Sequence, residues 1–259
     1  DAVIPLLHGA VGEDGSLRDV LDTLRLPYVG AGPAACRVAF DKPIAKAALR
    51  EAGASTADWI ALPHSSFREL GAPRLMAAAV ARLGLPLVVK PARGGSALGL
   101  AVVRTEEELP PAMIAAFSYC DTVMLESYVA GTEVAVSVVD SPDGPVALPA
   151  VEILSDSGLY DYQARYTAGM TEFFTPARLD DAASQAAAEL ALTAHATFGI
   201  RDLSRTDLIV MADGTPVFLE TNVAPGMTET SLLPQSVAAA GRDLGSVMGE
   251  LVDRAIARA

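Results

Sequence analysis

A predicted β-hairpin near the C-terminal end carries the residues best suited to chemistry. The stretch LSRTDLIVMADGTPVFLETN, residues 203–222, holds two β-rich runs around Asp213-Gly214, a dipeptide favoured in two-residue type I′ turns. Such a turn pairs Ala212 with Thr215, and residues two apart on a strand share a face. The side chains that this register gathers on one face are Arg205, Asp207, Glu220 and Asn222.

Two carboxylates that face each other destabilise a sheet unless a positive charge lies between them. Asp207 and Glu220 with the Asn222 carboxamide form an oxygen-only ligand set that suits Mg²⁺, with waters and phosphate oxygens completing the shell. Arg205 beside them could stabilise a developing negative charge. The alternative is a solvated hairpin face with an ordinary Asp–Arg pair.

The loop after this hairpin, APGMTETS, offers further polar groups. Gly226 lets the backbone approach a ligand closely, and its N–H could serve an oxyanion. Thr228, Thr230 and Ser231 precede a predicted helix, where hydroxyls and free N–H groups suit a substrate carboxylate. Ordinary N-capping by Thr230 or Ser231 is the alternative.

A second motif, VVKPARGGSALG, places Lys90 at the end of a predicted strand before a glycine-rich loop. Successive glycines free backbone N–H groups to face phosphates, although the order differs from a Walker loop. Lys42 is a second candidate phosphate contact, and Glu126 and Glu133 could bind adenine or ribose. A plain hairpin, a surface lysine and surface carboxylates are the alternatives.

The elements that must position these residues indicate a mixed α/β fold with several small sheets. We expect helices at about 15–25, 41–53, 70–83, 105–118 and 180–198 and over most of the chain after residue 222, the second with Lys42 in its first turn. We expect strands at 1–7, 27–30, 57–61, on both sides of the glycine loop, at 121–129, as a pair within 131–153, and at 203–222. Residues 154–179 are polar and irregular, which is typical of a functional loop.

Composition limits the classes of function. The chain has 259 residues and a net charge of −13, which disfavours a nucleic-acid partner. It shows neither a membrane-length apolar run nor a signal peptide. Two cysteines, Cys36 and Cys120, suit a reducing cytosol, and the histidines lack zinc-site spacing. No Cys-His or Ser-His arrangement is visible. Because DAVIPLLHG reads as a buried strand that begins at residue 1, we expect a segment to precede it in the full protein.

Taken in order, these pieces resemble the D-alanine–D-alanine ligases of the ATP-grasp superfamily. The resemblance covers nearly the whole chain and rests on HGAVGEDG, PYVG, DKPIAK, LPLVVKPARGGSALG, YDYQARY, SRTDLIV and ETNVAPGMTETSLLP. It implies an ATP-grasp fold, with two sheet-containing subdomains that clasp ATP beside the remnant of an N-terminal α/β domain. We expect divisions at residues 1–40, 41–125 and 126–259, with a lid loop at about 154–179.

The resemblance also implies roles for site residues. Those that bind two Mg²⁺ ions, with Mn²⁺ as an alternative, are Asp207, Glu220 and Asn222. Those that bind ATP are Lys42 and Lys90 at the phosphates and Glu126, Val129 and Glu133 around adenosine. Those that stabilise the tetrahedral intermediate are Arg205 and the Gly226 N–H. Those near the amino-acid substrates are His8, Glu13 and Ser231; for His8 the alternative is a satisfied strand-end histidine.

YDYQARYTAG resembles the family's lid loop, which excludes water from an acyl phosphate. Tyr166 matches the lid tyrosine that reaches Ser96, a feature of dipeptide-forming members, so an ester product is disfavoured. Arg165 replaces the family's lid lysine. Arg18-Asp19 replaces a Gln-Gly pair, at a position expected near the dimer contact or the substrate pocket.

The implied activity is ATP-dependent joining of two D-alanines through an acyl phosphate, for peptidoglycan synthesis. The implied partners are D-alanine and ATP, with neither nucleic acid nor membrane, in a cytoplasmic homodimer. Two alternatives stay open. One is an ATP-grasp ligase for other amino acids, such as D-Ala with D-Ser or a natural-product dipeptide. The other is an inactive nucleotide-binding fragment.

Overall fold

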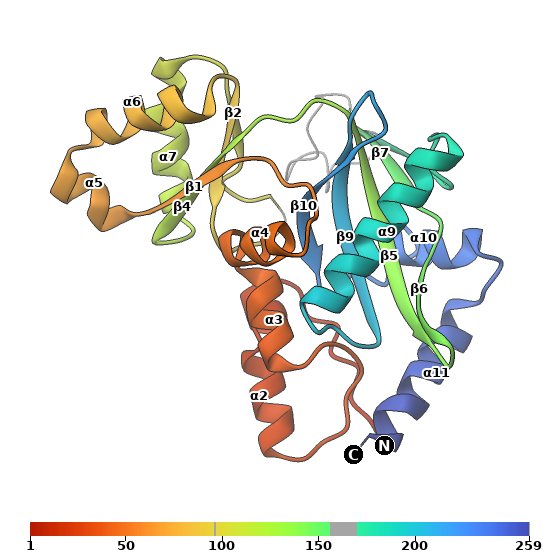
Figure 1. The fold of residues 1–259 in the computed structure, drawn as a ribbon. Coiled ribbons are helices and arrows are strands. Elements are labelled where there is room, and N and C mark those ends of the chain that lie inside the picture. The colour runs from red at the N-terminus through yellow and green to blue at the C-terminus, as the bar shows by residue number, and fades with distance from the viewer. Residues whose placement is uncertain (96, 156–169, 259) are drawn as a thin grey trace.

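Two antiparallel sheets organise the chain in the computed structural model, which describes residues 1–95, 97–155 and 170–258 (Figure 1). The four-stranded sheet has the order β1-β4-β2-β3 and consists of β1 (Trp59–Pro63), β2 (Leu87–Pro91), β3 (Ala101–Val103) and β4 (Thr122–Ser127). The six-stranded sheet has the order β10-β9-β5-β7-β8, with β6 beside β5, and consists of β5 (Thr132–Ser141), β6 (Gly144–Ala147), β7 (Val151–Ser155), β8 (Thr171–Phe174), β9 (Leu203–Val210) and β10 (Pro216–Asn222).

Helices pack against both sheets. The N-terminal helices are α1 (Ala10–Glu13), α2 (Ser16–Thr23), α3 (Pro33–Phe40) and α4 (Lys42–Glu51). Those beside the four-stranded sheet are α5 (His64–Leu70), α6 (Ala72–Leu83) and α7 (Leu109–Phe117), after the short 3₁₀ turn η1 (Glu106–Glu108). Those beside the six-stranded sheet are α9 (Asp181–Thr197), α10 (Leu232–Ala239) and α11 (Leu244–Ala257). None of the helices in the described part of the chain is long and apolar enough to span a bilayer.

The four-stranded sheet has one covered face and one open face. Leu87 and Val89 of β2 point to α6 and α7 and are fully buried in their core. Because side chains alternate along a strand, Val88 and Lys90 point the other way, as does Glu126 of β4, which pairs with Val88. The open face therefore presents a lysine and a glutamate toward the second sheet.

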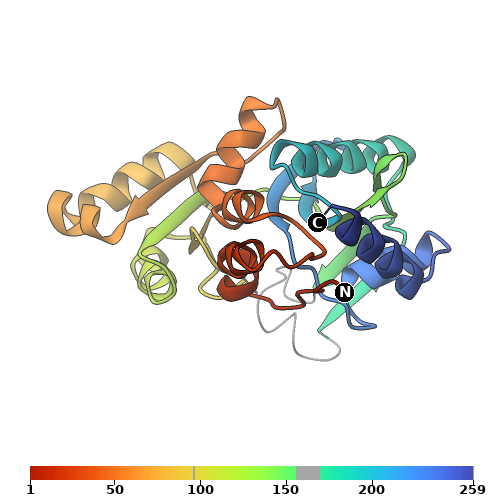
Figure 2. The same cartoon turned by 90° about the horizontal axis from the view of Figure 1, so that it is seen from below.

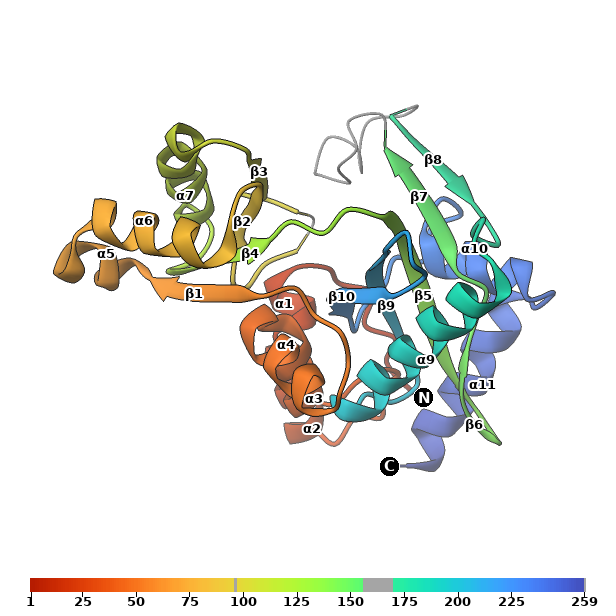
Figure 3. The ribbon, with the colours of Figure 1, turned by 45° about the horizontal axis from the view of Figure 1, so that its top comes forward.

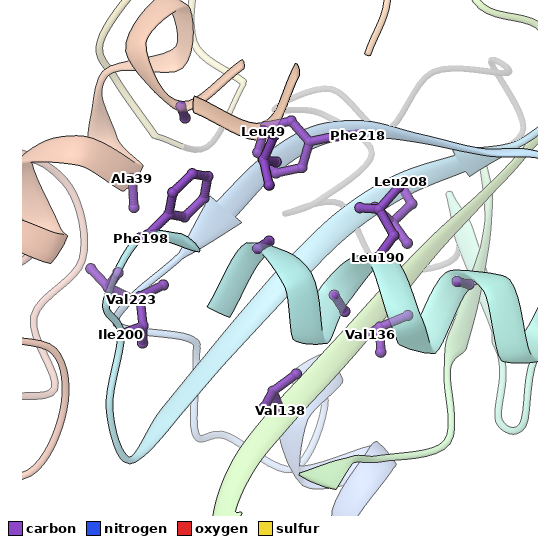
Figure 4. Close-up of a cluster of buried hydrophobic side chains, with 14 of the residues drawn as sticks. Ala39, Leu49, Val136, Val138, Leu190, Phe198, Ile200, Leu208, Phe218 and Val223 are labelled. Carbon is purple, nitrogen blue, oxygen red and sulfur yellow. The ribbon is translucent and has the colours of Figure 1, made fainter. Parts of the chain in front are cut away.

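The six-stranded sheet packs α9 on one face and α10 and α11 on the other (Figures 1 and 2). Val136, Leu208 and Phe218 pack with α9 in the core drawn in Figure 4. Leu203 at the start of β9 lies under α10 and α11. Asp207 lies farther along β9 on the same face as Leu203, and there the face lines a cavity and is not covered by α10 and α11.

Helix α4 lies beside both sheets and contacts each of them (Figure 3). Asp41 caps it by accepting a hydrogen bond from the Ile44 N–H at 3.2 Å, and Pro43 lies in its first turn. Leu49 packs into the core of the six-stranded sheet, whereas the Lys42 N–H donates to the Ala92 carbonyl after β2 at 3.0 Å. The helix thus confirms the sequence expectation and sets Lys42 between the sheets.

Several expected elements differ from the structure. Residues 1–7 and 27–30 are not strands and share one isolated parallel bridge, between Val3 and Tyr28. Helices α3 and α5 were not expected, residues 131–153 contribute to three strands instead of two, and β8 lies inside the expected loop. The divisions at residues 40 and 125 stay a prediction.

Candidate active site

The β9–β10 hairpin confirms the predicted pairing of site residues, but the predicted turn is wrong. Asp207 lies opposite Glu220, and Arg205 lies opposite Asn222. The turn holds three residues instead of two, because the Met211 N–H donates to the Thr215 carbonyl at 2.9 Å.

Gly214 ends this three-residue turn with a φ of 83°, the left-handed conformation that such turns require. The turn alone would shift the register by one residue and set Glu220 opposite Thr206, on the other face. A β-bulge between Phe218 and Glu220 leaves Leu219 without a pairing partner and restores the register. The bulge therefore turns the Glu220 side chain toward Asp207.

The four hairpin residues form one polar cluster, in which Arg205 and Asp207 are buried and Glu220 and Asn222 are half-buried. Arg205 binds Asp207 through two parallel hydrogen bonds, Nε to Oδ1 at 2.7 Å and Nη2 to Oδ2 at 2.8 Å. The Asn222 amide donates weakly to Asp207 Oδ2 at 3.4 Å. Glu220 Oε2 lies 3.1 Å from the Lys42 ammonium, which also donates to the Gly94 carbonyl at 2.8 Å. Asp207 is 2% exposed, so a solvated hairpin face is excluded.

A cavity of about 260 Å³ lies between the open face of the four-stranded sheet and the part of the six-stranded sheet that carries Asp207 and Glu220. The predicted ATP and metal residues that line it are Lys42, Lys90, Glu126, Val129, Glu133, Asp207 and Glu220. Gly94 and Gly95 of the glycine loop also line it. The arrangement brings phosphate-type cations, backbone donors and carboxylates to one place.

Both oxygens of Glu126 are bound to lysines. Lys90 pairs with Oε1, and Lys46 lies 2.7 Å from Oε2. Burial raises the pKa of the Glu126 carboxyl, but Lys90 and Lys46 together outweigh that effect and hold the pKa below its usual range. Sequence reasoning missed Lys46, although its spacing of four residues from Lys42 places both on one helix face.

A second polar cluster gathers His8, Gly226 and Ser231. The His8 Nδ1 lies 2.9 Å from the Ala224 carbonyl oxygen, and His8 is exposed beside the loop instead of ending a strand. A Cβ on Gly226 would lie 2.5 Å from Ser231 Oγ and 3.9 Å from His8 Cε1. Ser231 occupies the N-cap position of α10, but its hydroxyl bonds Thr228 Oγ1 at 2.8 Å and makes no capping bond.

Glu13 lies between the two clusters. It lines a small cavity with Lys42, Glu220 and Asn222, and its Oε2 accepts the Gly9 N–H at 2.7 Å. Burial is the largest influence on its carboxyl and raises the pKa to about 7, against the smaller opposing effect of the Gly9 hydrogen bond.

The raised pKa predicts a pH-dependent stability that glutamine at position 13 should remove. The folded protein holds the Glu13 proton between about pH 4.5 and 7 while the unfolded chain releases it, so the free energy of unfolding falls as pH rises through that window. We expect Glu13→Gln to remove up to about 3 kcal/mol of this fall, measured by urea unfolding across pH 4.5–8. The exposed Glu51→Gln control should retain it, and an unchanged slope in Glu13→Gln would contradict the assignment.

Three predicted residues, Ser96, Arg165 and Tyr166, lie outside the described residues. Arg18 is buried and lines a small cavity with Ala224 and Pro225 in the loop between β10 and α10, while Asp19 pairs with Arg37 at 2.7 Å on the surface. Sequence reasoning also missed Glu152, which lines the large cavity and binds Arg178.

The expectation that no Ser-His arrangement exists is wrong. His195 Nδ1 lies 2.8 Å from Ser204 Oγ, and its Nε2 lies 3.4 Å from Asp140 Oδ1. Ser204 is completely buried and His195 is 2% exposed, so no substrate reaches this group. The three residues join α9, β9 and β5 and have a structural role.

Two antiparallel sheets that enclose a cavity lined by lysines, carboxylates and a glycine loop define an ATP-grasp protein. Comparisons with known proteins agree. The family model described as the D-ala D-ala ligase C-terminus matches residues 48–253. The D-alanine–D-alanine ligase of Anaeromyxobacter sp. (strain K) is 42% identical over 253 residues, which are 98% of this chain and 79% of that protein. The chain belongs to the D-alanine–D-alanine ligase family.

Solved structures support the same family. The VanG D-Ala:D-Ser ligase of Enterococcus faecalis superposes with a TM-score of 0.88 at 30% identity, covering 98% of this chain and 73% of that one. The D-alanine–D-alanine ligase of Bacillus anthracis complexed with ATP gives a TM-score of 0.77 at 29% identity, covering 96% of this chain and 76% of that one.

Proposed function

We propose that this protein uses ATP to join two D-alanines into D-alanyl-D-alanine for peptidoglycan synthesis. The single observation that carries the proposal is the convergence of Lys42, Lys90 and the Asp207–Glu220 pair on one cavity between two sheets. The family membership supports it, as does the related Bacillus anthracis ligase solved with ATP.

The donor set fits Mg²⁺. Asp207, Glu220 and Asn222 offer oxygens from adjacent strands. In this structure Asp207 pairs with the Arg205 side chain and Glu220 with the Lys42 side chain. Among the described residues no three His, Cys, Asp or Glu side chains gather as a metal site, so phosphate oxygens and waters would supply the other ligands. Two Mg²⁺ ions, or Mn²⁺ in their place, would neutralise charge on the phosphates.

The residues of the cavity and of the neighbouring loop have separate roles in the reaction. Its first step is a phosphoryl transfer, whose catalysis depends on positioning of the reactants and stabilisation of charge. Lys42 and Lys90 hold the ATP phosphates while the donor carboxylate attacks the γ-phosphorus and ADP leaves. The acceptor amine then attacks the acyl phosphate and phosphate leaves. Arg205 and the Gly226 N–H stabilise the oxyanion of that second step, since preorganised donors act strongly in a dry site.

Ser231 is proposed to bind the acceptor carboxylate, with His8 and Glu13 beside the amino acids. Because a Cβ at position 226 would lie 2.5 Å from Ser231 Oγ, Gly226→Ala should displace that hydroxyl. We expect the KM for the acceptor D-alanine to rise about tenfold, a loss of about 1.4 kcal/mol, with the KM for ATP unchanged. Steady-state kinetics on Gly226→Ala and on the exposed control Gly249→Ala check this; an effect confined to ATP would contradict the assignment.

Product analysis tests the function directly. The protein is supplied with ATP, Mg²⁺ and either single amino acids or pairs, and the products are identified by mass. D-Alanyl-D-alanine with stoichiometric phosphate is the expected result. The superposition with the VanG D-Ala:D-Ser ligase makes D-Ala with D-Ser the second candidate. Turnover only with that pair would favour it.

We further propose that the protein is cytoplasmic and forms a homodimer, as the family resemblance implies. Light scattering on the purified protein measures its mass and would contradict the dimer if only the 26.8 kDa monomer is found. Calorimetry with an ATP analogue followed by turnover of the same sample separates an active ligase from an inactive nucleotide-binding fragment.

A further inference from the structure

All three lysines of the chain lie around one cleft. The chain has 19 lysines and arginines, and only Lys42, Lys46 and Lys90 are lysines. Lys42 and Lys46 are one turn apart on α4, and Lys90 is in β2. The proposed function uses Lys42 and Lys90 at the phosphates and leaves Lys46 without a role.

Among the described residues, Lys46 reaches the lining of the cleft through its contact with Glu126. Its side chain is fully buried and does not line the cavity. Its ammonium lies 2.7 Å from Glu126 Oε2 and 5.8 Å from the centre of the Trp59 ring. A bound ligand in the cavity would therefore meet Lys90 and Glu126, with Lys46 behind them.

Lys46, Glu126 and Lys90 form a group of three charges, and their sum indicates the role of Lys46. Glu126 pairs with Lys90 through one oxygen and with Lys46 through the other. Two ammonium groups and one carboxylate leave one net positive charge. Without Lys46, Glu126 and Lys90 would form a pair with no net charge. Because little water reaches this site to weaken electrostatic interactions, the Glu126 charge would then strongly reduce the attraction of Lys90 for phosphate.

We propose that Lys46 is a positioning residue, which neutralises Glu126 from behind the cavity and so keeps the charge of Lys90 for the nucleotide phosphates. The inference rests on the proposed function, because it needs phosphates in the cavity. It assigns Lys46 to the binding of the phosphate chain and not of adenosine.

Nucleotides that differ in phosphate number test the proposal. Calorimetry measures the Kd of adenosine, Mg²⁺–ADP and a non-hydrolysable Mg²⁺–ATP analogue on wild type and Lys46→Met. We expect the ADP and ATP-analogue Kd to rise about tenfold or more and the adenosine Kd to stay within about twofold. Equal weakening of all three ligands, or no weakening, would overturn the proposal.

Three further variants separate charge from packing. Arg50→Met is a matched control, since Arg50 lies in the next turn of α4 and its guanidinium carbon is 4.3 Å from the centre of the same Trp59 ring. This variant should leave the Kd of all three ligands unchanged. Lys46→Met with Glu126→Gln restores one net positive charge and should return the ratio of ADP to adenosine affinity toward wild type. A ratio that stays low contradicts the charge argument.

The remaining comparison holds even if Lys46→Met does not fold. In Glu126→Gln no carboxylate remains for Lys46 to neutralise, so a comparison of this variant with the double variant shows whether Lys46 acts through Glu126. The double variant should therefore bind ADP within about twofold of Glu126→Gln, and an ADP Kd about tenfold higher in the double variant would contradict a role of Lys46 through Glu126. If wild type binds ADP no tighter than adenosine, the proposed function fails as well; if it does bind tighter and Lys46→Met keeps the ratio, only the Lys46 inference fails.

Discussion

Glu220→Gln should lower kcat about 10³-fold or more while leaving the fold intact. The substitution keeps the shape of the side chain but removes one of the two proposed metal-binding carboxylates. A bound metal supplies several kcal/mol of charge stabilisation in the transition state, and each 1.36 kcal/mol is a factor of ten in rate. Turnover is measured by phosphate release over a range of Mg²⁺ and Mn²⁺ concentrations.

The control for this variant is Glu189→Gln, an exposed residue on α9 whose carboxylate accepts a hydrogen bond from the Gln185 side chain at 2.9 Å. It should retain wild-type turnover. Circular dichroism and urea unfolding of Glu220→Gln should show the wild-type fold, because Glu220 lies at the cavity and not in a core cluster. Full turnover in the folded variant would refute the assignment of Glu220 to the metal.

Arg205→Met should lower kcat about 10²–10³-fold, with the Kd of nucleotide little changed. Arg205 is proposed to stabilise the oxyanion that forms as the amine attacks, and removing one such donor from a preorganised site has an effect of this size. The guanidinium also holds Asp207 through two hydrogen bonds of 2.7 and 2.8 Å. Kinetics and calorimetry on the same preparation separate the two effects.

Arg205→Lys distinguishes charge from geometry. A lysine keeps the positive charge but cannot bind Asp207 through a planar fork, so it should recover only part of the lost kcat. Arg242→Met, which removes a surface pair with Glu250 at 2.7 Å, should have wild-type kinetics. An Arg205→Met variant that loses nucleotide binding but not kcat would place Arg205 in the phosphate site instead.

The hairpin shows how far local sequence rules reach. Alternating residues around Asp213-Gly214 predict two paired strands, and the structure confirms them. The rules do not predict the bulge at Leu219. It lies beside Phe218, whose N–H donates to the Ser55 carbonyl at 3.0 Å. That contact joins positions more than 160 residues apart, so no local pattern reveals it.

The cleft illustrates a similar limit. The motifs around Lys42 and Lys90 are visible in the sequence because both begin or end regular elements. Lys46 reads as one more polar residue of a helix, and its role follows only from the buried contact with Glu126. The Ser204–His195–Asp140 group is hidden for the same reason, since three elements of the fold bring it together.

Transfer of an oxygen atom from substrate to phosphate tests the central claim most directly. D-Alanine labelled with ¹⁸O in both carboxylate oxygens is incubated with unlabelled ATP, and the released phosphate is analysed by mass. A carboxylate that attacks the γ-phosphorus leaves one of its oxygens on phosphorus when the amine displaces it, so each dipeptide formed should release one ¹⁸O-labelled phosphate. Unlabelled phosphate released together with dipeptide would contradict the acyl-phosphate route and the roles assigned to this cleft.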